Sequence, residues 1–211
     1  MNKLEQKIEG FGVIPVVAIE DARDAAALGE ALIAGGLPCA EITFRTAAAQ
    51  ESIRTLAVRF PEMLVGAGTV LSVAQAQQAV DAGARFLVTP GFDEAVVAWS
   101  LGKDVPIFPG VATPTEINMA LRFGLNVLKF FPAQALGGVA TLKAIAAPYG
   151  GVRFIPTGGI NLQNLPDYLS LPAVVACGGS WLVKKSLIAS GQFDTISQLT
   201  AEAVQIRKQI S

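Results

Sequence analysis

The sequence of 211 residues contains no histidine and only two cysteines, Cys39 and Cys177. Without histidine, Ser-His-Asp and Cys-His catalytic systems are excluded, and an ordinary zinc site is not expected. Two cysteines far apart in the sequence do not indicate a disulfide framework, so we expect both to be small core residues. Acid–base chemistry must therefore depend on Asp, Glu, Lys, Tyr or water.

Charged residues are also scarce, at 16% of the chain against 52% hydrophobic residues. This balance predicts a large core and additional surface buried between subunits. The net charge of −1 and the absence of a Lys/Arg cluster argue against nucleic acid as a partner. No apolar run approaches the roughly 20 residues that span a bilayer. The polar start MNKLEQKIEG lacks the apolar core of a signal peptide, so we expect a cytoplasmic protein with no membrane partner.

Short apolar or β-branched runs alternate with longer alanine-rich stretches along the whole chain. The runs are typical of buried strands in a parallel sheet. The predicted strands are Val13–Ile19, Ala40–Phe44, Leu64–Gly68, Phe86–Val88, Pro106–Phe108, Val127–Phe131, Val152–Pro156 and Val174–Cys177.

The stretches between these strands have helical patterns, and several begin with a capping signal. Asp21, Ser72 and Thr113 each stand just before a helical run, and Pro114 occupies a first helical position. Gly35-Gly36, Gly83 and Gly124 stand where helices should end. The predicted helices are 21–34, 47–60, 73–82, 93–100, 114–123, 139–146, 162–169 and 194–209.

About eight strand–helix repeats in one chain predict an α/β fold, a (β/α)8 TIM barrel of a single domain (1–211) with a short N-terminal helix. An open doubly wound sheet is the alternative. Active sites of such barrels lie at the carboxyl ends of the strands. Glycine and polar residues gather after nearly every predicted strand, as in Gly66-Ala67-Gly68-Thr69, Thr89-Pro90-Gly91 and Thr157-Gly158-Gly159.

Lys129 lies inside the apolar run Val127–Phe131. A strand of a parallel barrel is buried, so this lysine must leave water, and burial favours the neutral amine that attacks a carbonyl. Glu41, Thr43 and Arg45 share one face of another strand, and that polar face should point into the barrel. Glu41 could relay protons and Arg45 could bind a carboxylate. The alternatives are a snorkelling lysine or a purely structural ion pair of Glu41 with Lys129 or Arg45.

Paired glycines end the last two predicted strands, in Thr157-Gly158-Gly159 and Cys177-Gly178-Gly179-Ser180. Loops after strands 7 and 8 of TIM barrels often form a phosphate site from backbone N–H groups. Two such pairs at these strands predict a phosphorylated ligand. Thr69, after Gly68, could hydrogen-bond a substrate or cap the next element.

The chain resembles the KDPG/KHG aldolase family, class I aldolases that cleave 2-keto-3-deoxy-6-phosphogluconate, over almost its whole length. The resemblance rests on five ordered motifs: Glu41-Ile42-Thr43-Phe44-Arg45-Thr46, Gly66-Ala67-Gly68-Thr69-Val70-Leu71, Lys129-Phe130-Phe131-Pro132-Ala133, Pro156-Thr157-Gly158-Gly159-Ile160 and Gly178-Gly179-Ser180-Trp181. Gln134 stands where many members have glutamate.

The resemblance implies a role for each matching residue and a homotrimer of barrels without metal or cofactor. Lys129 is the expected Schiff-base lysine and Glu41 the general acid/base. The other implied site residues are Arg45 and Thr69 for the pyruvate carboxylate, Gly158, Gly159, Gly179 and Ser180 for phosphate, Thr157 for stereochemical control, and Phe131 and Pro90 for the substrate pocket.

Several functions remain open at this point. The substrate could be 2-keto-3-deoxy-6-phosphogluconate, its galactonate epimer or 4-hydroxy-2-oxoglutarate. A phosphosugar isomerase or decarboxylase, or a non-catalytic phosphosugar-binding protein, could use the same barrel.

Overall fold

Parallel strands form the centre of the protein. We describe residues 2–210 from a computed structural model. They form two sheets, in the orders β5-β4-β3-β2-β1-β9 and β6-β7-β8. The strands are β1 (Val13–Val17), β2 (Cys39–Thr43), β3 (Leu64–Gly68), β4 (Leu87–Val88), β5 (Ile107–Phe108), β6 (Gly110–Val111), β7 (Val127–Phe130), β8 (Arg153–Pro156) and β9 (Cys177–Gly179).

The two sheets join into one closed barrel. Only Pro109 separates β5 from β6, and proline lacks the N–H that a strand ladder needs, so β5 and β6 are two halves of one barrel strand. On the other side, the bridges Phe154–Val174 and Thr157–Gly178 connect β8 to β9. The predicted eight-stranded barrel is confirmed, and the open sheet is wrong.

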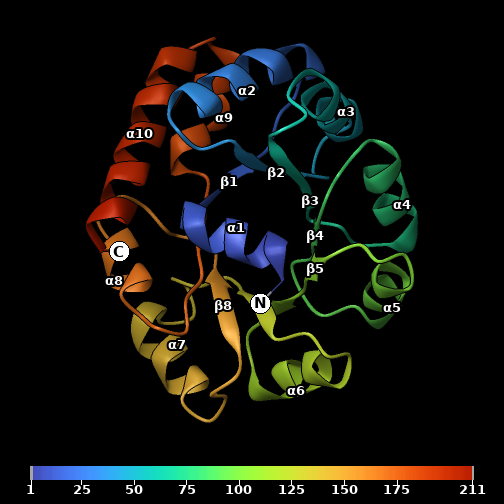
Figure 1. The fold of residues 1–211 in the computed structure, drawn as a ribbon, viewed down its shortest axis with the longest axis vertical. Coiled ribbons are helices and arrows are strands. Elements are labelled where there is room, and N and C mark those ends of the chain that lie inside the picture. Colours follow the sequence, from blue (N-terminus) through green and yellow to red (C-terminus); the bar gives the residue numbers. More distant parts are fainter. Residues whose placement is uncertain (1, 211) are drawn as a thin grey trace.

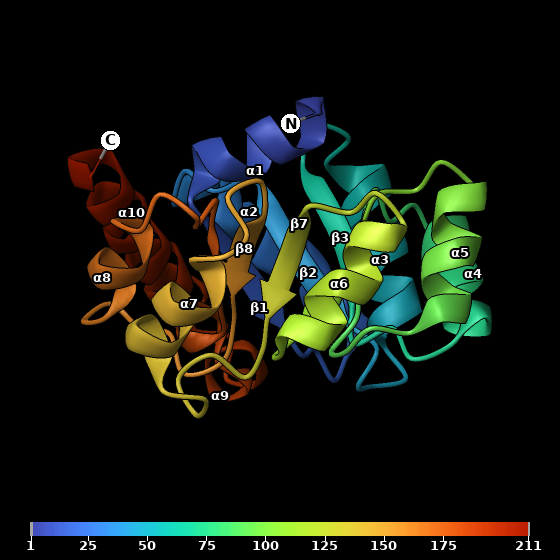
Figure 2. The same ribbon diagram turned by 90° about the horizontal axis from the view of Figure 1, so that it is seen from below.

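Helices surround the strands, while α1 crosses one end of the barrel (Figure 1). The side view places α1 at the opposite end from the carboxyl ends of the strands, where α9 lies (Figure 2). No helix of residues 2–210 has both the length and the apolar character to cross a bilayer. The helices are α1 (Lys3–Phe11), α2 (Ala25–Ala34), α3 (Ala49–Arg59), α4 (Val73–Asp81), α5 (Glu94–Gly102), α6 (Pro114–Arg122), α7 (Gly138–Ala146), α8 (Leu165–Leu169), α9 (Lys185–Ala189) and α10 (Phe193–Ile210).

Side chains cap α1, α4, α5 and α6, and the sequence predicts two of these caps, Ser72 and Thr113. Ser72 accepts a hydrogen bond from a backbone N–H of the first turn of α4, and Thr113 forms a capping box with Glu116 at α6. Asp21 is an exception, because it caps a short 3-10 helix, Ala22–Asp24, before α2 begins at Ala25. The single predicted helix 21–34 is therefore two elements.

The barrel wall separates two apolar layers. The outer layer lies between strands and helices and includes Ile42, with Phe44 packed against it, as the two-residue period predicts. The inner layer fills the α1 end of the barrel. Its members are Ile8 of α1 together with Ile14, Cys39, Leu64, Phe86, Val88, Phe108, Val127, Ile155, Val175 and Ala176.

Two further predicted boundaries are wrong by more than two residues, and one helix was not predicted. The last strand is Cys177–Gly179, not Val174–Cys177, because pairing with β1 starts at Val13, opposite Cys177. Helix α8 begins at Leu165, not Leu162, because residues 161–164 form a turn. Helix α9 was not predicted. The strand predicted to reach Ile19 ends at Val17, and the remaining boundaries agree within two residues, which is the usual uncertainty.

Candidate active site

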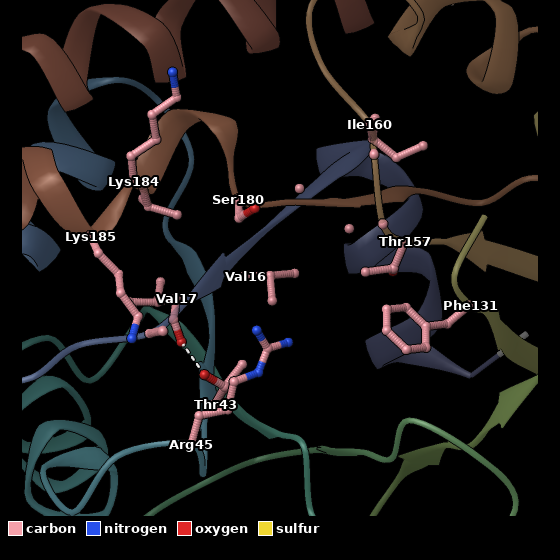
Figure 3. Close-up of a pocket in the computed structure, with 16 residues that line it drawn as sticks. Val16, Val17, Thr43, Arg45, Phe131, Thr157, Ile160, Ser180, Lys184 and Lys185 are labelled. Atoms are coloured by element: carbon pink, nitrogen blue, oxygen red, sulfur yellow. Dashed lines mark hydrogen bonds between the residues drawn. The ribbon is translucent and has the colours of Figure 1, made fainter. Parts of the chain in front are cut away.

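A cavity of about 440 Å³ opens at the carboxyl ends of the strands. Arg45, Phe131, Thr157 and Ser180 point toward it from different elements (Figure 3). The predicted residues that line it are Arg45, Phe131, Thr157, Gly158, Gly159, Gly179 and Ser180. Residues that are up to 135 positions apart in the sequence (45 to 180) thus meet at one end of the barrel.

Lys129 and Glu41 meet inside the barrel, from β7 and β2. Lys129 is 3% exposed and Glu41 2% exposed, and Nζ of the lysine lies 3.4 Å from Oε1 of the glutamate. The same Nζ lies 5.2 Å from the ring centroid of Phe131, which lines the cavity. Each charged residue stands two positions before a cavity-lining residue on its own strand face, Lys129 before Phe131 and Glu41 before Thr43. The pair therefore lies next to the cavity, between it and the inner apolar layer.

Glycine on the neighbouring strand leaves room for the glutamate. A Cβ atom on Gly68 would lie 2.0 Å from Oε1 of Glu41, and β2 pairs directly with β3 at this level. A side chain larger than hydrogen at position 68 would force the carboxylate to move. The motif Gly66-Ala67-Gly68 thus serves packing inside the barrel. Its first glycine similarly accommodates the ring of Phe86.

The other two members of the Glu41 face have distinct surroundings. Thr43 is fully buried and donates its hydroxyl to the carbonyl of Val17, at 2.7 Å. Arg45 is exposed at the cavity, and its guanidinium group points into the open space (Figure 3). Its Nε donates to Oγ1 of Thr69 at 3.2 Å, which leaves the fork of terminal nitrogens for an anion.

Thr69 holds an unusual backbone conformation to make that contact. Its φ is +54°, in the left-handed region that β-branched residues rarely adopt. Strain of this kind persists only when the surrounding structure imposes it, and it clusters at functional sites. Thr69 therefore contacts the site through Arg45, although it is not among the cavity-lining residues.

Two glycine segments border the opposite side of the cavity. Gly158 and Gly159 have φ of +98° and +79°, a conformation that favours glycine at both positions. Gly178 is needed for a different reason, because a Cβ there would lie 2.3 Å from Oγ1 of Thr157. Ser180 is exposed and directs its hydroxyl toward the cavity (Figure 3).

Pro90 lies apart from these residues. It borders a separate hollow of about 240 Å³ with Val70, Leu71 and Thr89, and it does not line the main cavity. Its carbonyl oxygen packs against Gly110, where a Cβ would lie 2.2 Å away. Position 90 therefore shapes the junction between β4 and β6.

Several residues that line the cavity were not predicted as site residues, including Ile160, Lys184 and Lys185. Lys185 pairs with Glu20 at 2.5 Å, whereas Lys184 runs away from the cavity centre (Figure 3). A pair of lysines just after a glycine-rich strand end was the available signal. Among residues 2–210, no three side chains of Asp, Glu, Cys or His gather as a metal site would require.

Comparisons with known proteins identify the family. The family model for KDPG and KHG aldolase matches residues 4–199. This chain belongs to the KDPG and KHG aldolase family. A 2-dehydro-3-deoxy-phosphogluconate aldolase of Treponema pallidum (strain Nichols) is 52% identical over 206 residues, 98% of each chain. The KHG/KDPG aldolase of Escherichia coli (strain K12) is 42% identical, covering 92% of this chain and 91% of its own.

A solved structure of a KDPG aldolase from Legionella pneumophila, with pyruvate captured as a covalent carbinolamine, has the same fold. Its TM-score is 0.90 at 40% identity, and the match covers 93% of this chain and 96% of that one. The resemblance read from five motifs is therefore confirmed. In this KDPG and KHG aldolase family member, Gln134 accepts a hydrogen bond from the hydroxyl of Tyr168 at 2.9 Å. Burial raises the pKa of the Tyr168 hydroxyl above its usual value.

Proposed function

We propose that this protein is a metal-independent class I aldolase that cleaves 2-keto-3-deoxy-6-phosphogluconate to pyruvate and glyceraldehyde 3-phosphate. The observation that carries the proposal is the buried Lys129–Glu41 pair, 3.4 Å apart, beside a cavity with both polar and apolar lining. A buried ion pair is weak evidence for stability, since apolar residues of similar volume often serve as well. A lysine and a carboxylate in this arrangement are what imine chemistry requires.

Lys129 attacks the C2 ketone of the substrate, and the carbinolamine loses water while Glu41 relays protons. The iminium that forms accepts electrons. When Glu41 takes the proton of the C4 hydroxyl, directly or through water, the C3–C4 bond breaks and glyceraldehyde 3-phosphate leaves. The remaining enamine is protonated at C3, and hydrolysis releases pyruvate and restores Lys129.

The residues around the cavity would hold the two charged ends of the substrate. Arg45, with Thr69 at its Nε, binds the carboxylate. Gly158, Gly159, Gly179 and Ser180 bind the phosphate at the opposite side. Thr157 and Phe131 lie between the two ends, where Thr157 controls the stereochemistry and Phe131 forms a wall. Pro90 borders a separate hollow, so we assign it no direct contact with the substrate.

Two rival functions differ from an aldolase in a measurable step, whereas two rival substrates would share its chemistry. A phosphosugar isomerase or decarboxylase needs no imine, so borohydride would trap no pyruvate on it. A phosphosugar-binding protein would bind ligand without releasing pyruvate. The galactonate epimer and 4-hydroxy-2-oxoglutarate would be cleaved by the same chemistry, and we expect 4-hydroxy-2-oxoglutarate to be a second substrate that yields pyruvate and glyoxylate.

A lactate dehydrogenase-coupled assay tests the proposal. We expect pyruvate release from the gluconate-derived substrate with the highest kcat/KM, and slower release from 4-hydroxy-2-oxoglutarate, which lacks the phosphate. A higher kcat/KM for the galactonate epimer would reassign the substrate. Absence of pyruvate from all three would contradict the proposed function.

We also propose that the protein is a cytoplasmic homotrimer. Exposed apolar side chains support an interface, with Leu71 58% exposed beside the hollow that contains Pro90. Sedimentation should give a mass about three times the 21.9 kDa of one chain. A single-chain mass at micromolar concentration would contradict the trimer.

A further inference from the structure

The Gly158–Gly159 turn is fastened through its carbonyl groups. The carbonyl of Gly158 accepts from the backbone N–H of Gln134 at 3.0 Å, and the carbonyl of Gly159 accepts from Nδ2 of Asn164, also at 3.0 Å. Gln134 also packs tightly on the turn, because a Cβ on Gly159 would lie 2.4 Å from its Cβ. A backbone segment (Gln134) and a side chain (Asn164) thus fix two successive peptide planes.

Fixing these carbonyls also fixes the N–H groups on the other side of each peptide. In a planar trans peptide the C=O and the next N–H point in opposite directions. The carbonyl of Gly158 therefore orients the N–H of Gly159, and the carbonyl of Gly159 orients the N–H of Ile160. Gly159 and Ile160 line the cavity, whereas Gln134 and Asn164 do not. Because the partners of both carbonyls lie outside the cavity lining, the carbonyls face away from the cavity and the two N–H groups face it.

The amide of Asn164 has only one orientation that satisfies its neighbours. Its Oδ1 accepts from the backbone N–H of Asn161 at 2.9 Å, so its Nδ2 must face the Gly159 carbonyl. Asn161 uses its own Oδ1 to accept from the backbone N–H groups of Gln163 and Asn164, at 2.9 and 3.1 Å. The contacts of the Asn164 side chain therefore require both its Nδ2 donor and its Oδ1 acceptor. Those of the Asn161 side chain require only its Oδ1 acceptor.

We propose that Asn164 is a positioning residue for the phosphate site. By holding the Gly159 carbonyl, it keeps the N–H of Ile160 directed into the cavity as a ligand for the phosphate of the substrate. Successive backbone N–H groups of this kind form a concavity that binds anions. The inference rests on the proposed function, and it adds Ile160 and Asn164 to the residues that recognise phosphate.

Three variants distinguish the effect of losing the Nδ2 donor from the effect of adding a negative charge. Asn164→Ala removes the donor without adding charge, and Asn164→Asp removes the donor and adds a negative charge. Asn161→Asp adds the same charge three positions away but keeps its acceptor oxygen. The readouts are the Kd of inorganic phosphate by titration calorimetry, the KM and kcat for 2-keto-3-deoxy-6-phosphogluconate, and borohydride labelling of Lys129 with pyruvate, which lacks phosphate.

Both Asn164 variants should weaken phosphate binding and raise KM by about tenfold, since one positioned hydrogen bond is lost. Asn161→Asp should change either value by no more than about threefold, because position 161 is only half-buried and solvent still screens its charge. Pyruvate labelling should remain at the wild-type level in all three, which also shows that the variants are folded. A wild-type Kd for phosphate in Asn164→Ala would overturn the inference. So would a loss of phosphate affinity in Asn161→Asp equal to that in the Asn164 variants.

Measurements on the wild type distinguish failure of the proposed function from failure of this inference. Wild-type protein that binds phosphate but is neither labelled by pyruvate nor active would contradict the aldolase and leave the phosphate comparison valid. Wild-type protein that is labelled but does not bind phosphate would overturn the role of Asn164 alone.

Discussion

Thr69 combines backbone strain with a hydrogen bond to Arg45, which lines the cavity. Its φ of +54° is costly for a β-branched side chain, by about 1–3 kcal/mol. In return its hydroxyl accepts from Nε of Arg45 and orients the guanidinium toward the cavity. Removing the side chain should therefore have two distinct effects. It relieves the backbone strain, and it abolishes the hydrogen bond to Arg45.

Replacing Thr69 with glycine should stabilise the fold and weaken catalysis. Relief of strain, less the entropy that glycine loses on folding, predicts a gain of about 1 kcal/mol in the free energy of unfolding. Loss of the Arg45 contact predicts about a tenfold rise in KM for the keto acid. Denaturant unfolding and steady-state kinetics measure both effects.

Asp104 provides the matched control, because its φ is +55° and it lies on the loop that enters β5, at the opposite end of the barrel from the cavity. Asp104→Gly should leave KM unchanged, with a smaller gain in stability because aspartate tolerates this conformation better. An unchanged KM in Thr69→Gly would show that the contact with Arg45 has no functional role.

Individual residues near the cavity were predictable where the two-residue period of a strand, or the end of a strand, marked them. The two-residue alternation placed Glu41, Thr43 and Arg45 on one face, and burial of the strand singled out Lys129. The distance between Glu41 and Lys129 was not predictable, because it depends on barrel closure across 88 residues of sequence. Asn164 was missed because its amide acts on a carbonyl five residues back, in a turn expected to be helical.

Among the elements, α1 has a structural role at the end of the barrel away from the cavity (Figure 2). Its Ile8 is fully buried against the inner apolar layer, and Leu4 and Phe11 pack around it. A capping box at Asn2 and Glu5 begins this helix and Gly12 ends it, with φ of +69°. The helix thus excludes water from the apolar layer that lies beneath Lys129 and Glu41.

Truncating Ile8 to alanine should destabilise the protein by about 2–5 kcal/mol, since it leaves a cavity in a closely packed layer. Val58 on α3 is 78% exposed, and Val58→Ala should change stability by no more than about 0.5 kcal/mol. Chemical denaturation measures both. Equal effects of the two substitutions would contradict the sealing role of α1.

Element boundaries were predictable from the sequence where local hydrogen bonds determine them. Ser72 and Thr113 marked helix starts correctly, because a side-chain oxygen must satisfy free N–H groups there. The last strand was misplaced because Gly178 and Gly179 have low strand propensity. Tertiary packing selects glycine at both positions, since a Cβ would collide with Thr157 or Trp181.

At the scale of the whole molecule, the barrel interior changes from apolar to polar along its axis. The inner apolar layer lies next to α1, the Lys129–Glu41 pair follows, and the cavity opens beyond it. Both cysteines belong to the buried core, Cys39 to the inner layer and Cys177 to the outer one. The expectation that they are unpaired core residues is confirmed.

Burial raises the pKa of both thiols far above the usual value near 8.5. Their contribution to stability is complete below the pKa of the unfolded chain and is lost as pH rises above it, because only the unfolded state releases the protons. We expect the free energy of unfolding to fall by about 1 kcal/mol per thiol between pH 8.5 and 9.5, because the unfolded thiol is already half ionised at the lower pH. A Cys39→Ala/Cys177→Ala double variant should show a flatter pH dependence over that range. An identical slope would contradict the prediction.

The central claim is that Lys129 forms an imine with a 2-keto acid, and borohydride reduction in the presence of pyruvate tests it most directly. Peptide mass analysis should find one reduced pyruvate per chain, on Lys129, in the wild type and in a Lys143→Ala control that removes an exposed lysine of α7. Lys129→Ala should show no label while remaining folded. Labelling that persists in Lys129→Ala, or a wild type that remains unlabelled, would contradict the account.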